Sequence, residues 1–73
     1  MNNGTTEKAI AANLGALTEM LRKALADAEE AIGYIAEGNR NAAIGTICDL
    51  DRLLADATAL HGAALALHRR TPA

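Results

Sequence analysis

Apolar residues recur along this chain at alternating steps of four and three, in two runs of nearly equal length. Because this spacing returns to one side of an α-helix, each run predicts an amphipathic helix whose apolar side packs on a partner. The first run comprises Ile10, Leu14, Leu17, Leu21, Ala24, Ala28, Ala31 and Ile35. The second comprises Ala43, Ile47, Leu50, Leu54, Ala57 and Ala64, with Leu53, Leu60 and Leu67 widening the stripe.

A polar segment, residues 38–41, separates the two runs and predicts a turn. Gly38 suits the left-handed conformation that ends many helices, and Asn39 or Asn41 can cap the next helix. We therefore expect one antiparallel helical hairpin over residues 6–70, with helices over 6–37 and 41–70. Residues 1–5 are expected to be disordered, with Thr5 or Thr6 as the first helix cap, and residues 71–73 to form a tail.

Several local features refine this hairpin. Gly15 favours a bend in the first helix, because glycine lowers helix stability. Gly33 and Gly45 lie near the turn on opposite arms, which indicates a close approach of the two backbones. Glu19 and Lys23 have the spacing of a favourable ion pair on a helix.

Composition limits how the hairpin can be stabilised. Half of the 73 residues are apolar, but many are alanine and Tyr34 is the sole aromatic residue. Alanine favours helix and adds little core volume, and chains of this size are only marginally stable alone. The sequence therefore predicts an all-α protein that forms homo-oligomers, either a four-helix bundle or a larger helical assembly.

The net charge of −2 argues against a general nucleic-acid-binding protein, which needs clustered Lys and Arg. The single cysteine, Cys48, lies among apolar residues and is interpreted as buried, in a reducing compartment. Neither a leader peptide nor an apolar run of membrane-spanning length is evident, so we expect a soluble, cytoplasmic protein without a membrane partner.

Candidate metal and catalytic groups are sparse. His61 and His68 are about 10 Å apart along one helix, too far to share one metal ion. The acidic residues lack the paired Glu-x-x-Glu and Glu-x-x-Asp spacings of all-α nucleotide pyrophosphatases, so a solvated outer face explains them better. We expect no catalytic residue, no metal and no cofactor. The acidic residues concerned are Asp27, Glu29, Glu30, Glu37, Asp49, Asp51 and Asp56.

Polar chemistry concentrates at the turn. Arg40 can bind a phosphate beside the unsatisfied N–H groups of a helix start, and Tyr34 can stack on a base. Asn side chains can contact base or ribose edges. These groups form a candidate ligand site of Tyr34, Asn39, Arg40, Asn41 and Thr46. The alternative is a well-capped hairpin with an exposed arginine.

Over about residues 30–70, the chain resembles small phage helical-hairpin sponge proteins that counter CBASS and Thoeris immunity. The resemblance rests on size, on the hairpin and on the segment Asn39-Arg40-Asn41-Ala42-Ala43-Ile44-Gly45-Thr46. It implies pockets between protomers that sequester a cyclic dinucleotide or a cyclic ADP-ribose derivative, in the host cytoplasm if the protein is viral. In architecture alone the chain also resembles Rop-type RNA-loop binders, but it lacks their basic, aromatic helical face.

The sequence thus predicts a non-catalytic, oligomeric binding protein, with the anti-defence sponge as one form of it. The alternative is a regulatory hairpin, an adaptor or inhibitor, that binds another protein and has no small-molecule ligand.

Overall fold

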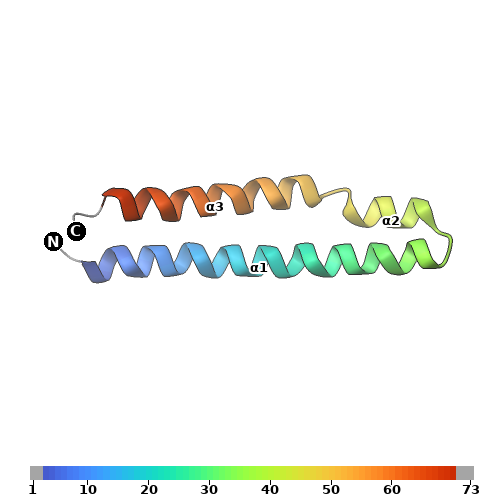
Figure 1. Cartoon of the computed structure of the whole chain (residues 1–73), viewed down its shortest axis with the longest axis horizontal. Coiled ribbons are helices and arrows are strands. Elements are labelled where there is room, and N and C mark those ends of the chain that lie inside the picture. Colours follow the sequence, from blue (N-terminus) through green and yellow to red (C-terminus); the bar gives the residue numbers. More distant parts are fainter. Residues whose placement is uncertain (1–2, 71–73) are drawn as a thin grey trace.

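The computed structural model describes residues 3–70, which form an antiparallel helical hairpin (Figure 1). One arm is α1 (Asn3–Ala36), and the other arm consists of α2 (Arg40–Ile47) followed by α3 (Leu50–Arg70). The first helix packs against both α2 and α3. The Cα atoms extend over 57 × 15 × 13 Å, so the molecule is a rod two helices wide. The predicted all-α hairpin is confirmed.

The turn forms as the sequence predicts, by a Schellman motif centred on Gly38. This glycine has φ +77°, and its N–H donates to Ile35 O at 2.9 Å, while Asn39 N–H donates to Tyr34 O at 2.8 Å. The side chain of Asn39 then accepts a hydrogen bond from Ala42 N–H at 3.1 Å, which caps α2. Asn39 therefore ends one helix and starts the next, which keeps the connection short.

The first helix is longer and more regular than predicted. It begins at Asn3 rather than Thr6, so neither Thr5 nor Thr6 is its cap, and residues 3–5 are helical. Residues 1–2 and 71–73 of the predicted tails lie outside the described part. The expected bend at Gly15 is absent, because α1 continues through it. The long contact with the other arm outweighs the low helix propensity of one glycine.

The second arm is not the single helix that was predicted over residues 41–70. It breaks at Cys48 and Asp49, between α2 and α3. Cys48 N–H bonds to Gly45 O in a tighter turn, and Leu53 N–H bonds to Asp49 O to begin α3. Residues 44–49 combine two isoleucines with Gly, Thr, Cys and Asp, all weaker helix formers than the alanines and leucines around them. The helix is interrupted where its sequence supports it least.

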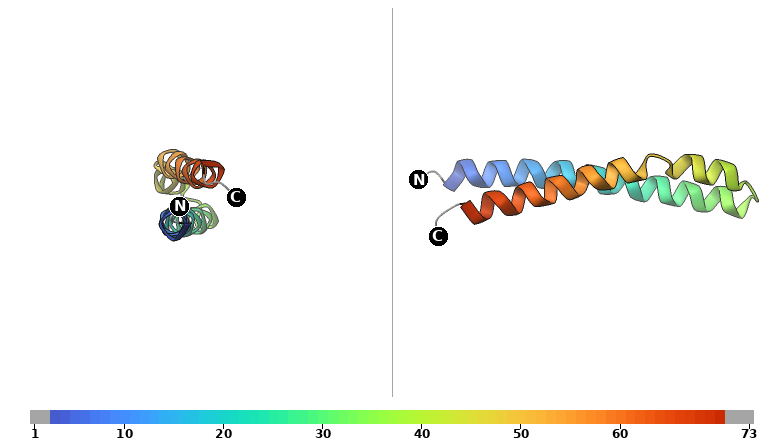
Figure 2. Two further views of the ribbon diagram at one scale, coloured as in Figure 1. Left: turned by 90° about the vertical axis from the view of Figure 1, so that its left-hand side faces the viewer. Right: turned by 90° about the horizontal axis from the view of Figure 1, so that it is seen from above.

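The two arms meet along a line of buried and half-buried residues, here called the seam. Seam residues are spaced three or four apart on each arm, and this spacing continues across the break between α2 and α3. It produces the gentle left-handed winding of the two arms in Figure 2. On α1 the seam comprises Thr6, Ile10, Asn13, Leu17, Met20, Ala24, Asp27, Ala31 and Tyr34. On the other arm it comprises Ala43, Thr46, Leu50, Leu53, Ala57, Leu60, Ala64 and Leu67.

The predicted apolar stripe is therefore only partly buried. Leu17 and Ala24 lie in the seam as expected, but Leu14, Leu21 and Ile35 are exposed on α1. The reason is width, because the apolar band of α1 is broader than the strip that one facing helix can cover. On the second arm Leu54 is likewise exposed, whereas the residues that widened the stripe (Leu53, Leu60 and Leu67) occupy the seam.

The buried core of the described residues is very small. It consists of four alanines, and no large side chain in residues 4–70 is fully buried. A hairpin with so little buried apolar surface gains little hydrophobic stabilisation from its own fold.

Two further expectations about small residues are wrong. A Cβ added to Gly33 or Gly45 would meet no atom within 4 Å, so these glycines do not mark a close backbone approach. Cys48 is exposed rather than buried, because it lies in the break and outside the seam.

Candidate functional site

The most pronounced surface feature is an excess of exposed large apolar side chains. Eight of them are between 37% and 68% exposed, and each stands one residue after a seam residue. Leu14 follows Asn13, Ile32 follows Ala31, and Leu54 follows Leu53. The eight, here called the apolar face, are Leu14, Leu21, Leu25, Ile32, Ile35, Ile44, Leu54 and Leu65.

These eight residues share one side of the hairpin. Each step of one residue along an α-helix rotates the direction of the side chain by about 100° around the helix axis, always in the same sense. Two antiparallel helices are related by a two-fold axis perpendicular to their common plane, so an equal advance on each arm leads to the same side. The apolar face therefore spans both arms, and on the second arm Asp51, Thr58 and His61 lie between its apolar residues.

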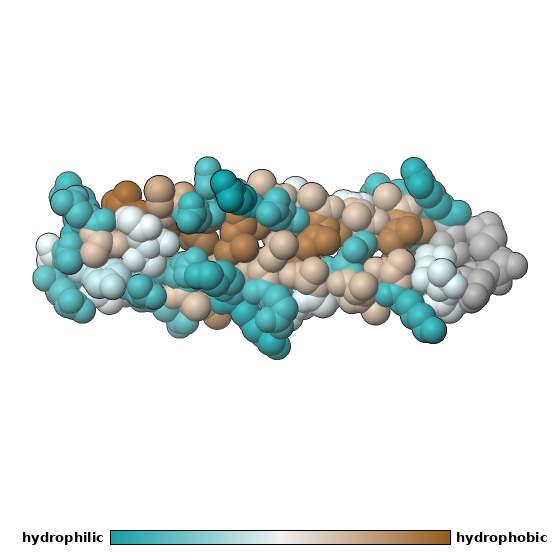
Figure 3. Space-filling view, turned by 180° about the vertical axis from the view of Figure 1, so that it is seen from behind, coloured by the Kyte–Doolittle hydropathy of each residue, from teal (hydrophilic) through white to brown (hydrophobic). Residues whose placement is uncertain are grey.

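The opposite side is small and charged. The positions one residue before the seam carry alanine, glycine and charged residues on both arms. A cleft of about 250 Å³ opens there, lined by Lys23, Asp27, Thr46, Asp49, Arg52, Leu53 and Asp56. Figure 3 shows this side, with polar side chains gathered around the middle of the rod and apolar seam residues visible between the arms. The two broad sides of the hairpin thus have opposite chemical character.

Lys23 and Asp27 form the best-defined ion pair of the cleft, with Nζ and Oδ1 2.7 Å apart. The hydrogen bond to Asp27 raises the pKa of Lys23, and so do the charges of Asp27, Glu30 and Asp49. Three carboxylates line the cleft against two cations, so it does not favour a phosphate group.

The acidic residues were predicted to lie on a solvated outer face, and this holds for Glu29, Glu30, Glu37, Asp49, Asp51 and Asp56, which are exposed. It is wrong for Asp27, which occupies a seam position with only 16% of its side chain exposed. A carboxylate at this position is satisfied by Lys23, one helical turn away.

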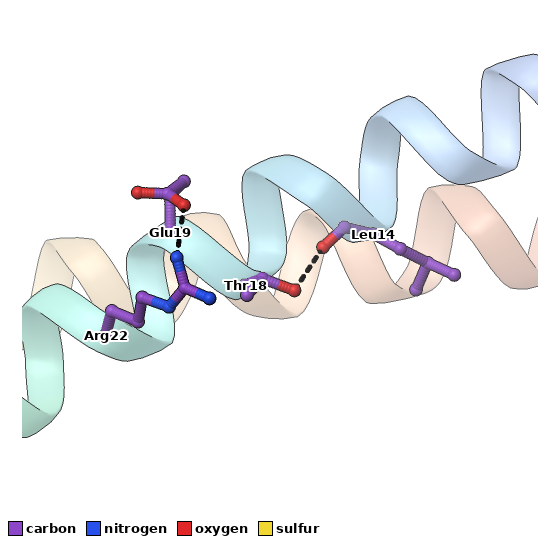
Figure 4. Close-up of polar contacts among 4 residues, drawn as sticks. All are labelled: Leu14, Thr18, Glu19 and Arg22. Carbon is purple, nitrogen blue, oxygen red and sulfur yellow. Dashed lines mark hydrogen bonds and ion pairs between the residues drawn. The ribbon is translucent and has the colours of Figure 1, made fainter.

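The predicted pairing of Glu19 with Lys23 is also wrong. Arg22 pairs with Glu19 instead, at 3.0 Å (Figure 4). Lys23 pairs with Asp27. The same view shows Thr18 Oγ1 donating to Leu14 O at 2.8 Å, within one turn of α1. Both ion pairs stay within α1, so neither holds the two arms together.

The five residues of the predicted ligand site are not gathered around one point. Asn39 caps α2, and Thr46 Oγ1 donates to Ala42 O at 2.8 Å and lines the charged cleft. Arg40 and Asn41 are exposed, and Tyr34 is half-buried at the turn end of the seam. Around the axis of α2, the positions of Arg40, Asn41 and Thr46 differ by roughly 100–140°. One chain therefore does not direct these side chains at a common ligand, and the site stays a prediction.

Within residues 3–70, no group of three or more His, Cys, Asp or Glu residues is placed to hold a metal ion. His61 and His68 are both exposed. Each follows a seam residue directly, so they lie on the same side as the apolar face. None of the helices described combines the length and apolar composition that crossing a bilayer requires.

Comparison with known proteins finds no match to this chain among family models, curated proteins or solved structures. The functional argument therefore rests on the geometry of the hairpin itself.

Sequence reasoning missed the apolar face, although its signal was present. Two apolar stripes, offset by one residue, run side by side along α1, and a single facing helix covers only one of them. The second stripe therefore stays exposed on the hairpin.

Proposed function

We propose that this protein is a non-catalytic, homo-oligomeric binding protein that associates through its apolar face. The observation that carries this proposal is the placement of all eight exposed large apolar residues on one side of the hairpin. Scattered exposed leucines are ordinary, but eight large apolar side chains gathered on one side of a small protein are typical of an interaction site.

The size of this surface supports the proposal. The whole broad side that carries the apolar face projects over about 57 × 15 Å between Cα atoms, or roughly 850 Å², which is the scale of the ~800 Å² that each partner contributes to a standard protein interface. Covering it would join the half-buried leucines of the seam to the apolar face in one interior. A four-helix bundle is the simplest assembly that supplies the core missing from the single hairpin.

Neighbouring residues on α1 provide a matched test. Leu25 is on the apolar face and Ala26 is exposed on the opposite side, so lysine at each position adds the same charge to a different surface. We expect the wild type and Ala26→Lys to sediment as oligomers of the 7.6 kDa chain at micromolar concentration. Leu25→Lys should dissociate and lose most of its helical circular dichroism, because a buried unpaired charge is costly. A folded, monomeric wild type contradicts the proposal.

Sequestration of a cyclic nucleotide signal is a second candidate, and it depends on the same oligomer. Arg40 lies one helical turn before Ile44 on α2, and so on the side of the apolar face, at its turn end. A second copy covering that face would bring further groups toward Arg40 and complete a pocket that one chain does not form.

A further inference from the structure

The distribution of apolar residues along the rod indicates how two copies pack. Two copies can join their apolar faces around a two-fold axis in two ways. If the axis follows the long direction of the rod, both turns lie at the same end, and α1 of each copy covers α2 and α3 of the other. If the axis crosses the rod, the turns lie at opposite ends, and each α1 covers the other α1 in reverse.

On α1 the apolar face is displaced toward the turn. It begins at Leu14 and ends at Ile35, while residues 4–13 of this helix add no large exposed apolar side chain. The second arm carries its apolar residues from Ile44 near the turn to Leu65 near the open end. The two arms thus differ in where their apolar surface lies, which makes the two packings unequal.

With the turns together, the large residues meet at three levels. Ile32 and Ile35 lie within about one helical turn of the hairpin turn, at the level of Ile44. Near the middle of the rod, Leu21 and Leu25 lie at the level of Leu54. Toward the open end, Leu14 lies near the level of Leu65, so every large residue of the apolar face of α1 has a large counterpart on the second copy.

With the turns apart, a two-fold axis near Leu21 and Leu25 sets Ile32 over Leu14 of the other α1. Ile35 then lies over Ala11, so one isoleucine of each copy loses a large apolar partner.

Charge also differs between the packings. With the turns together, Glu7 lies beside His68 of the other copy. With the turns apart, Arg40 lies against His68 instead. The packing with the turns apart does place Asp51 near His61 of the other copy. An exposed ion pair contributes less than the apolar surface of one isoleucine in each copy, so the contact of Ile35 with Ile44 favours the packing with the turns together.

We infer that the apolar face binds a second copy of this chain with both turns at the same end, α1 of each copy covering α2 and α3 of the other. This inference rests on the proposed function, and it adds the identity and direction of the partner.

A distance between identical labels distinguishes the two packings. Asn41 is exposed near the turn, and Asn41→Cys in a Cys48→Ala background gives one spin label per chain. With the turns together, the labels of a dimer should be less than about 35 Å apart, since packed helices are separated by only 8–10 Å. With the turns apart, the labels should be about 40–50 Å apart, since roughly 13–16 residues of helix at ~1.5 Å each separate Asn41 from the two-fold axis in each copy.

Paired cysteines give an independent readout in the same background. A mixture of Ile32→Cys chains and Ile44→Cys chains should yield a covalent dimer with a short bifunctional thiol reagent. Keeping the two cysteines on separate chains prevents a crosslink within one hairpin. The matched mixture of Ile32→Cys chains and Leu14→Cys chains should remain uncrosslinked, because these positions meet only with the turns apart. A dimer with distant labels and a 14–32 crosslink overturns this inference and leaves the proposed function standing. A wild type that stays monomeric overturns both, and assigns the apolar face to a different protein.

Discussion

Lys23 reaches along α1 to Asp27, with 2.7 Å between Nζ and Oδ1, and the two side chains differ sharply in exposure. The lysine is 66% exposed and the aspartate 16%. The aspartate stands in the seam, so its charge is compensated by a neighbour on the same helix rather than by the opposite arm.

This pair predicts a specific dependence of stability on pH. The hydrogen bond to Asp27 and its charge raise the pKa of Lys23 above the ordinary value of 10.5. The contribution of the pair to the free energy of unfolding is therefore fully present below pH 10.5 and is lost as the pH rises through the folded-state pKa. Denaturant unfolding between about pH 9 and pH 12 should show wild type and Lys23→Met converging. A constant difference between them would show that Asp27 does not act on Lys23.

The cap of α2 distinguishes two asparagines that look equivalent in the sequence. Asn39→Ala should lower the free energy of unfolding by about 1 kcal/mol, because the bond from Ala42 N–H to its side chain is lost. Asn41→Ala, two residues later at an exposed site, should change stability by less than about 0.5 kcal/mol. Thermal and denaturant unfolding at one fixed protein concentration compare the two variants. Equal losses would contradict the assignment of the cap.

The left-handed turn predicts opposite effects at two glycines. Gly38→Val should destabilise the hairpin by at least ~1 kcal/mol, since φ +77° is strained for a β-branched residue. Gly15→Ala should stabilise it by about 0.5–1 kcal/mol, because α1 runs through Gly15 and open space surrounds the added Cβ. Unfolding curves at equal concentration measure both. A loss of stability in Gly15→Ala would indicate that this outer surface is covered in the assembly.

The nucleotide candidate is tested by calorimetry with cyclic di- and trinucleotides and with cyclic ADP-ribose isomers. If one of them binds, Arg40→Ala should weaken binding by about 2 kcal/mol while leaving the oligomer intact, the scale for losing a charge-assisted pair. Tyr34→Ala should cost about 1–3 kcal/mol if a base stacks on the ring. The absence of heat with every compound, or equal binding by wild type and Arg40→Ala, would remove the sponge and leave protein association as the function.

Local chemistry made the turn predictable. The dihedral angles of Gly38 and the cap at Asn39 follow from properties of single residues, which act over a few positions of the chain. The break at Cys48 and Asp49 was harder to predict, since each weak helix former between Ile44 and Asp49 is tolerated singly inside helices. Their combined effect depends on how firmly the other arm holds that segment.

The division of the apolar residues could not be predicted from one helix alone. Leu17 and Leu21 belong to the same apolar band of α1, yet one lies in the seam and the other is exposed. The packing of the two whole arms decides which of the two adjacent stripes faces the second arm. The stripe that does so includes a polar residue, Asp27. The candidate ligand residues were misjudged for a related reason, because closeness in sequence does not place Arg40 and Thr46 on one side of α2.

The core of four alanines has a consequence for how much folded protein a cell contains. When the missing interior is supplied by a second copy, folding and association become a single equilibrium. The amount of native protein then rises with the square of the concentration of unfolded chains, and the melting temperature rises with total concentration. In the proposed dimer, dilute chains would stay unfolded and open to proteolysis, so the expression level would set the fraction of chains that are folded.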